Sequence, residues 1–193
     1  GQGEGDNLKI RSAGSLVVET ALNLHEEGLD FRQFDNGHGA IDVIILVVAG
    51  QGVAYTDDNY FWPHMYFIPT GDDLSDIDSN ALQSNEGYLK IDGVVIQKYI
   101  VIHEKYAFSY GGASPGDIHP IGTFCHEIGH VLGVPDLYDN STTSAAGIGD
   151  WGLMGSGNWV SQTSPAYMSA WSRYTLGYIE PGIIENVIDY PLI

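Results

Sequence analysis

The sequence predicts a domain of the α/β or α+β class, in which a mixed, twisted sheet is combined with a few helices. Three observations support this: a β-branched run at 41–49, a second β-rich stretch at 93–103, and helical periodicity before and after them. With 193 residues, the chain has the length of one domain and can bury a substantial core.

Each element of this fold has a local signal. Between residues 12 and 28, apolar side chains recur at helical spacing until Gly28, a natural stop. The run 41–49 is almost unbroken by polar residues, which predicts a strand covered on both faces of one mixed sheet. Further elements are expected as a strand at 65–68, β structure at 93–103, a helix from His119 or Pro120 to Leu132, and an irregular stretch at 134–163. The last helix is predicted to run to about Gly177, with Ser164 as its capping residue and Pro165 as its first residue.

Charge and composition exclude several classes of function. Seven basic and 25 acidic residues give a formal net charge of −18, which repels phosphate backbones and argues against a nucleic-acid partner. A single cysteine, Cys125, excludes an internal disulfide framework. The longest apolar run, 41–52, is too short to span a bilayer, so no membrane span is expected.

The residues that carry chemistry lie in the predicted helix that ends at Leu132. Positions four apart share one helix face, so His126 and His130 can present two imidazole nitrogens to one ion. Glu127 lies about 100° around the helix from His126, where its carboxylate can reach a water on the ion without binding the ion. A general base needs such a position, from which it can take a proton from the water without binding the ion. A bare His-Glu-x-x-His also arises by chance on amphipathic helices, so the residues that follow decide the interpretation.

A catalytic zinc site needs a third protein ligand and one open position for water. Gly133 and Pro135 favour an abrupt helix end, because glycine tolerates positive φ and proline cannot continue the helix. The chain can then turn back and bring Asp136 to the ion as an oxygen ligand. Asp139 is close enough in sequence to compete with Asp136 for this role.

The likeness to known proteins extends along most of the chain. His126–Asp136 has the form HExxHxxGxxD and resembles the zinc-binding consensus of the metzincin metallopeptidases, in the variant whose third ligand is aspartate. Among these, the chain most resembles the immune inhibitor A family of secreted bacterial metallopeptidases. The matching segments fall within about 15–181 and are 34–39 with Asp42, 49–52, 62–64, 126–139, 151–159, 169–173 and 176–178.

The resemblance implies a metzincin-like catalytic domain at 12–181, with an N-terminal part at 12–133 and a C-terminal part at 134–181. A flexible segment at 1–11 would precede this domain, and 182–193 would begin a following segment or form a C-terminal strand. The implied protein is a secreted zinc endopeptidase with one catalytic Zn²⁺ ion, Glu127 as general base, and Met154 in a methionine turn beneath the metal. We expect a monomeric domain, part of a larger chain, that acts on protein or peptide substrates.

Two further expectations concern the substrate. A β edge within Gly93–His103 is predicted to align a peptide as an added antiparallel strand. The alternative from another class is a non-catalytic zinc-containing adhesin or glycoprotein-binding module. The presence of Glu127 favours the enzyme, since a purely structural zinc site does not need a base.

The sequence departs from the resembled families in the transition-state residue. Some metzincins carry a tyrosine two residues beyond the methionine of the turn, where this chain has Ser156. Tyr138 and Tyr167 are the candidates to assist the transition state in its place. His64, beside Trp62, is a candidate for a residue near the cleft.

A second departure concerns calcium. His38 stands where relatives often have an acid in a calcium loop, so Asp35 and Asp42 are expected to cap turns instead. Ca²⁺ is also considered for the acidic loop that contains Asp72, Asp73, Asp76 and Asp78, where a solvated turn is the favoured interpretation.

Overall fold

The fold is that of an α+β domain, as predicted. The computed structural model describes residues 13–51, 62–68, 88–107, 109, 112–139, 146–161 and 163–182. Its helices are α1 (Ala13–Glu26), α2 (Ile121–Leu132) and α3 (Ala170–Thr175), with short 3-10 helices η1 (Phe31–Phe34), η4 (Gly149–Trp151) and η5 (Ser156–Trp159). The strands are β1 (Ala40–Ile41), β2 (Ile44–Gln51), β3 (His64–Phe67), β4 (Leu89–Ile91), β5 (Val94–Ile96) and β6 (Lys98–Lys105). The predicted end segments, except Gly182, and the acidic loop with Asp72 and Asp78 lie outside the described residues.

The described strands form two small mixed sheets, so the prediction of one sheet was wrong. One sheet has the order β2-β6-β3 and the other the order β1-β5-β4. In each, one pair is parallel and one antiparallel. The two long β-rich runs are each interrupted, between Ile41 and Ile44 and at Gln97, so their halves pair in separate ladders.

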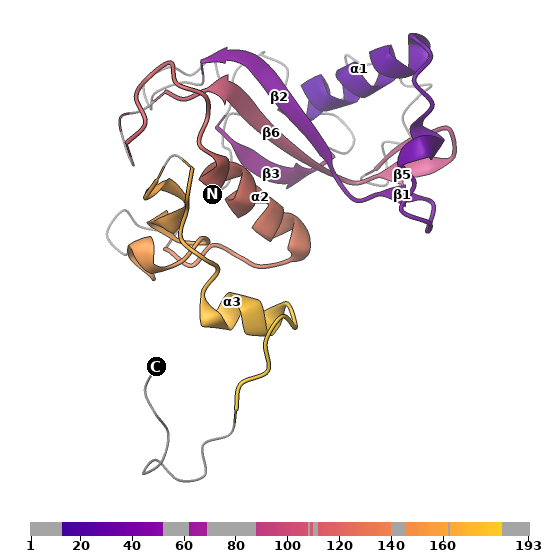
Figure 1. Cartoon of the computed structure of the whole chain (residues 1–193). Helices are drawn as coiled ribbons and strands as arrows, with labels where there is room; N and C mark the ends of the chain where they lie inside the picture. Colours follow the sequence, from indigo (N-terminus) through magenta and orange to yellow (C-terminus); the bar gives the residue numbers. More distant parts are fainter. Residues whose placement is uncertain are drawn as a thin grey trace, which may run out of the picture.

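The helices lie on opposite sides of the β2-β6-β3 sheet. Figure 1 shows α1 on one side, α2 on the other, and α3 with the C-terminal part beyond α2. Strand β6 is the central strand, paired with β2 on one side and β3 on the other, and β5 is likewise paired on both sides. The prediction that a peptide aligns on an edge within Gly93–His103 is therefore contradicted at Val95, Ile96 and 99–101, because these residues are paired on both sides.

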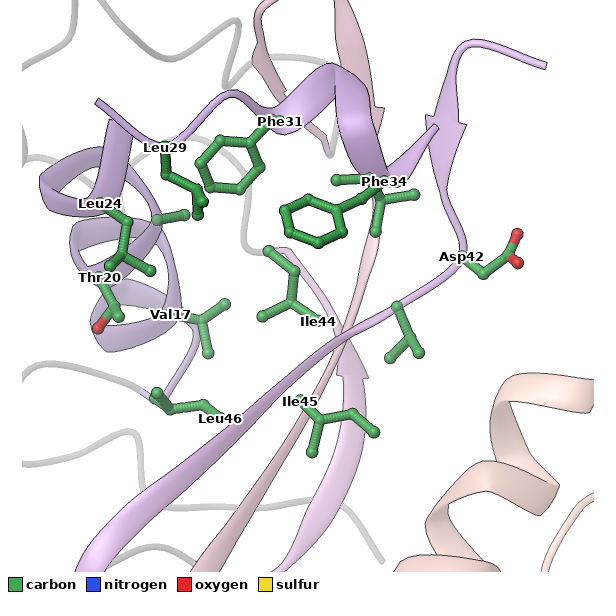
Figure 2. A pocket seen from close by; sticks show the side chains of 13 residues that line it. Val17, Thr20, Leu24, Leu29, Phe31, Phe34, Asp42, Ile44, Ile45 and Leu46 are labelled. Atoms are coloured by element: carbon green, nitrogen blue, oxygen red, sulfur yellow. The ribbon is translucent and has the colours of Figure 1, made fainter. Parts of the chain in front are cut away.

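The main core lies between α1 and the sheet. Val17 and Val18 of α1 pack with Tyr99 and Val101 of β6, all at most 4% exposed. Mostly apolar side chains of α1, η1 and β2 also line an open pocket of about 510 Å³ (Figure 2).

Strand β2 is covered on one face only, which corrects the prediction of two covered faces. Its inward residues, among them Ile44 and Leu46, pack against the main core between α1 and the sheet. Ile45 and Val47 point the other way and are 41% and 51% exposed. The reason is position: in the described sheet β2 is an outer strand, while α2 packs against β3 and β6.

The last helix begins later than predicted. Its residues are Ala170–Thr175, and the capping residue is Ser169, whose hydroxyl accepts a hydrogen bond from the Ser172 amide. Ser164 and Pro165 precede a non-helical stretch instead. The backbone there forms hydrogen bonds outside any helix. The Ala166 amide donates to the Gly157 carbonyl, and the Leu153 amide donates to the Tyr167 carbonyl. These long-range bonds outweigh the local capping signal.

A buried histidine before α2 gives the fold a pH dependence. Burial and the nearby His103 lower the pKa of His119 from 6.5 to about 4, and the residue is 8% exposed. At a pH between 4 and 6.5, His119 is therefore protonated in the unfolded chain and neutral in the folded chain. The contribution of His119 to the free energy of unfolding is fully present above pH 6.5 and is lost as the pH drops toward 4. Between pH 7 and pH 4.5, we expect the free energy of unfolding of metal-free His119→Phe to fall by roughly 2–3 kcal/mol less than that of metal-free wild type.

Urea unfolding of both proteins at pH 7 and pH 4.5 measures this difference. His38→Gln, at an exposed loop histidine, is the control and should keep the wild-type pH dependence. Equal acid sensitivity of His119→Phe and wild type would contradict the assignment.

Candidate metal centre

The turn that ends α2 brings the next segment back toward the helix. Gly133 has φ of 100°, in the left-handed region that favours glycine. The Gly133 amide donates to the His130 carbonyl at 3.0 Å, and the Val134 amide donates to the Gly129 carbonyl at 3.1 Å. This pair of bonds is a Schellman motif, and it satisfies carbonyls at the helix end. The abrupt stop predicted from Gly133 is confirmed, and its consequence is the position of Asp136.

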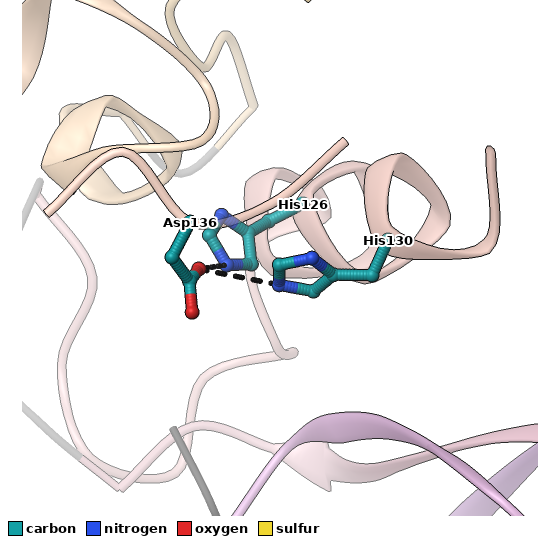
Figure 3. Close-up of side chains that lie close together, drawn as sticks. All are labelled: His126, His130 and Asp136. Carbon is teal, nitrogen blue, oxygen red and sulfur yellow. Dashed lines mark ion pairs between the residues drawn. The ribbon is translucent and has the colours of Figure 1, made fainter. Parts of the chain in front are cut away.

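Three side chains meet beside α2. His126 and His130 project from one face of the helix toward Asp136, which faces them from the returning segment (Figure 3). Their nearest ligand atoms all lie within 4.8 Å of one another, and this is the single group of its kind within the described residues. Asp136 Oδ1 lies 3.0 Å from His126 Nε2 and 3.2 Å from His130 Nε2. Ligands of a tetrahedral zinc with bonds of ~2.0–2.1 Å are about 3.3 Å apart, so the two carboxylate–imidazole distances are close to those of a zinc site, and the residue types are those of a zinc donor set.

Main-chain carbonyls orient both imidazoles. His126 Nδ1 lies 2.9 Å from the Leu153 carbonyl oxygen, and His130 Nδ1 lies 2.9 Å from the Val134 carbonyl oxygen. Each Nδ1 therefore carries the ring proton in the neutral state, which leaves Nε2 as a lone-pair donor that faces Asp136. Burial lowers the pKa of His130, but the Asp136 carboxylate and the Val134 carbonyl outweigh this effect, so the pKa is raised overall.

Glu127 lies next to this group but outside it. The residue is 6% exposed, and its Oε2 accepts a hydrogen bond of 2.7 Å from the Met65 amide of β3. Burial raises the pKa of Glu127, while the neighbouring imidazoles of His126 and His130 oppose the shift. A carboxylate in this environment takes up a proton more readily than an ordinary glutamate.

The weaker candidates are placed at different distances from the group. The Tyr138 ring is stacked on the His126 ring, with centroids 6.4 Å apart and 16° between planes. Asp139 is described but does not belong to the three-residue group. Tyr167 is 90% exposed. His64 lies with its ring against Tyr99, within 3.3 Å of the hydroxyl, and Tyr99 belongs to the core on the α1 side of the sheet.

The loop considered for calcium is a hydrogen-bonded turn. Asp35 Oδ1 accepts from the Gly37 and Gly39 amides, and these bonds lower the pKa of Asp35. Asp42 Oδ1 accepts from the side-chain amide of Asn36. The predicted capping role is confirmed for Asp35, whereas the contact of Asp42 is to a side chain and leaves its capping role a prediction. Nothing in the described residues supports calcium there.

A methionine lies directly under the helix that carries the histidines. Met154 is fully buried, and a Cβ added to Gly129 would lie 2.5 Å from its sulfur atom. At Gly122, one helical heptad earlier, an added Cβ would lie 1.8 Å from the Asn158 carbonyl oxygen. The two glycines allow the segment 153–158 to approach α2 closely enough for the Leu153 carbonyl to reach His126.

This close approach predicts an unusual sign for a glycine-to-alanine change in a helix. Alanine normally stabilises a helix relative to glycine by about 1 kcal/mol. Because of Met154, we expect Gly129→Ala instead to destabilise the metal-free protein by about 1–2 kcal/mol, measured by urea unfolding. In the Met154→Ala background the same change should be neutral or stabilising. A stabilised Gly129→Ala single variant would contradict the packing described here.

The main-chain contacts of the site could not be predicted from the residue pattern. These are the Leu153 and Val134 carbonyls on the histidines and the Met65 amide on Glu127. Main-chain groups carry no residue-type signal, so only the register of β3 and the path of 134–154 could have revealed them. The pocket between α1 and β2 is lined by none of these residues.

An α+β fold with a partly buried His-His-carboxylate group beside a buried glutamate is typical of metal-dependent hydrolases. Residues 34–182 match the family described as immune inhibitor A peptidase M6, catalytic domain, and the chain belongs to this family. The resemblance found in the sequence is thereby confirmed, and the family implies a bound metal.

Two relatives illustrate the match. Immune inhibitor A of Bacillus thuringiensis subsp. alesti is 26% identical in an alignment 211 positions long, which covers 96% of this chain and 28% of the relative. Pre-pro-metalloprotease PrtV of Vibrio cholerae serotype O1 is 37% identical in an alignment 59 positions long, which covers 28% of this chain and 6% of the relative. The chain thus spans a minor part of the length of both. Among the described helices, none has the length and apolar character needed to cross a membrane.

Proposed function

We propose that this chain is the catalytic domain of a secreted, metzincin-type zinc endopeptidase. The observation that carries the proposal is the convergence of His126 Nε2, His130 Nε2 and Asp136 Oδ1, with both Nδ1 atoms already engaged by carbonyls. Two imidazoles and one carboxylate form a donor set of catalytic zinc, which keeps a fourth position open. Membership of a metallopeptidase family supports the same conclusion.

The residues of the site have separate roles in this proposal. His126, His130 and Asp136 would hold the ion. When bound, zinc would lower the pKa of a water molecule and polarise the scissile carbonyl. Glu127 accepts the proton of the attacking water and delivers it to the nitrogen of the leaving amine. Its burial beside the ligands, at 6% exposure, keeps this transfer away from bulk solvent.

The segment after the ligands supports the metzincin assignment. We propose that Met154 belongs to a methionine turn, because it is buried against Gly129. Gly129 lies between His126 and His130 on α2. The adjacent Leu153 carbonyl orients His126 from the same turn. Tyr138, stacked on His126, is the preferred candidate to assist the transition state. Tyr167 and His64 stay predictions without an assigned contact to the ligands.

A hydrolysis assay tests the enzyme against the binding module. Casein and an internally quenched peptide would be incubated with the native protein, with a chelator, and after zinc is added back. We expect internal cleavage that the chelator abolishes and zinc restores. Cleavage that persists after the metal is removed would contradict a zinc peptidase. No cleavage by zinc-loaded protein, together with binding to immobilised glycoproteins, would favour the non-catalytic adhesin.

A further inference from the structure

Strand β3 presents alternate amides away from its partner strand. The Ile68 amide donates to the Gln97 carbonyl at 2.8 Å, which makes this pair a hydrogen-bonded one in the antiparallel ladder. The register pairs His64 with Val101 and Met65 with Ile100. Hydrogen-bonded and non-hydrogen-bonded pairs alternate, so the amides of Met65 and Phe67 point away from β6. Within the described residues, β3 pairs with β6 alone.

One of these two outward amides is used by the site. The Met65 amide donates to Glu127 Oε2 at 2.7 Å, a short distance typical of a bond to a charged acceptor. The two residues are 62 positions apart in the sequence. The bond therefore connects β3 directly to α2, one residue from His126. Glutamate has three rotatable side-chain bonds, and a fixed donor selects one orientation of its carboxylate.

The geometry points to the main-chain amide of Met65 as a positioning group for Glu127 in the hydrolytic reaction. By engaging Oε2, the amide leaves Oε1 as the oxygen that exchanges the proton. This role rests on the proposed peptidase function and adds to it a residue outside the helix motif. A displacement of about 1 Å in a catalytic group can lower a rate by about 100-fold, which sets the size of the expected effect.

The contact itself can be tested without metal or activity. The chain has three methionines, so ¹⁵N-methionine labelling gives three amide signals, and Met65→Ala assigns one of them. An amide proton bonded to a carboxylate resonates downfield. In metal-free protein, Glu127→Ala should move the Met65 signal upfield and leave that of Met168 in place. An unmoved Met65 signal would overturn the inference.

The role in catalysis is tested by removing the amide proton. Met65→Pro removes it, and an outward-facing position on an outer strand is where proline is tolerated. Met65→Ala controls for the side chain, and Phe67→Pro is the matched control because its amide faces the same way without a contact to Glu127. We expect kcat of Met65→Pro to fall about 100-fold below that of Met65→Ala, with KM within about twofold and zinc content unchanged.

The outcomes separate this inference from the proposed function. If zinc-loaded wild type does not hydrolyse peptides, the proposed function fails, whatever the amide signals show. If wild type is active and Met65→Pro equals Met65→Ala in kcat, the positioning role is wrong. If Met65→Pro does not fold, the shift of the Met65 signal on Glu127→Ala decides in its place.

Discussion

Replacing Glu127 with glutamine is expected to lower kcat by about 10²–10⁴-fold, because the amide cannot accept the proton of the attacking water. The change keeps the size of the side chain and its ability to accept a hydrogen bond from the Met65 amide. Zinc binding should persist, since Glu127 lies outside the group formed by His126, His130 and Asp136. Steady-state kinetics on a quenched peptide, together with metal content, measure both effects.

The control for this prediction is a glutamate far from the site. Glu26 ends α1 and is exposed, on the opposite side of the sheet from α2. Glu26→Gln should keep wild-type kcat and zinc content. Wild-type kcat in Glu127→Gln would exclude this residue as the base, and a loss of zinc in that variant would indicate that Glu127 is a ligand.

Removing the carboxylate of Asp136 is expected to weaken zinc binding by more than about 100-fold. Loss of a residue that only supports a ligand already costs ~10–100-fold, and Asp136 would be a ligand itself. The histidines stay oriented by the Leu153 and Val134 carbonyls, so Asp136→Ala should remain folded with a two-ligand site. Competition with a chromophoric chelator at neutral pH measures the change in Kd.

Asp139→Ala is the matched variant, since Asp139 also follows the helix but lies outside the three-residue group. We expect its zinc affinity to fall less than that of Asp136→Ala, by no more than about 10–100-fold, because Asp139 would not bind the ion itself. If Asp139→Ala binds zinc weakly and Asp136→Ala binds it as tightly as wild type, the third ligand is Asp139 instead.

The parts of the site that the sequence could predict are those fixed by local geometry. Two histidines four residues apart on α2 share a face wherever the helix lies. Gly133 ends the helix because its φ of 100° is open to glycine, and this turn is short enough to limit where Asp136 can go. The meeting of all three side chains thus depends on only eleven consecutive residues.

The predictions that failed depended on distant partners. Ser164-Pro165 carries a strong helix-start signal, but the neighbouring backbone is bonded to Gly157 and Leu153. The apolar run in β2 predicts two covered faces, and the outer position of the strand leaves Val47 51% exposed. The Met65 contact to Glu127 likewise requires the register of β3 against β6, which a single sequence does not contain.

One zinc ion is proposed to bind between α2 and the segment that returns after Gly133. Anomalous scattering from zinc-loaded crystals, recorded above and below the zinc edge, locates that ion. We expect one strong peak per chain, bonded to His126 Nε2, His130 Nε2 and an oxygen of Asp136 at about 2.0–2.2 Å. A peak at other residues, or a zinc held by the two histidines with Asp136 turned away, would contradict it.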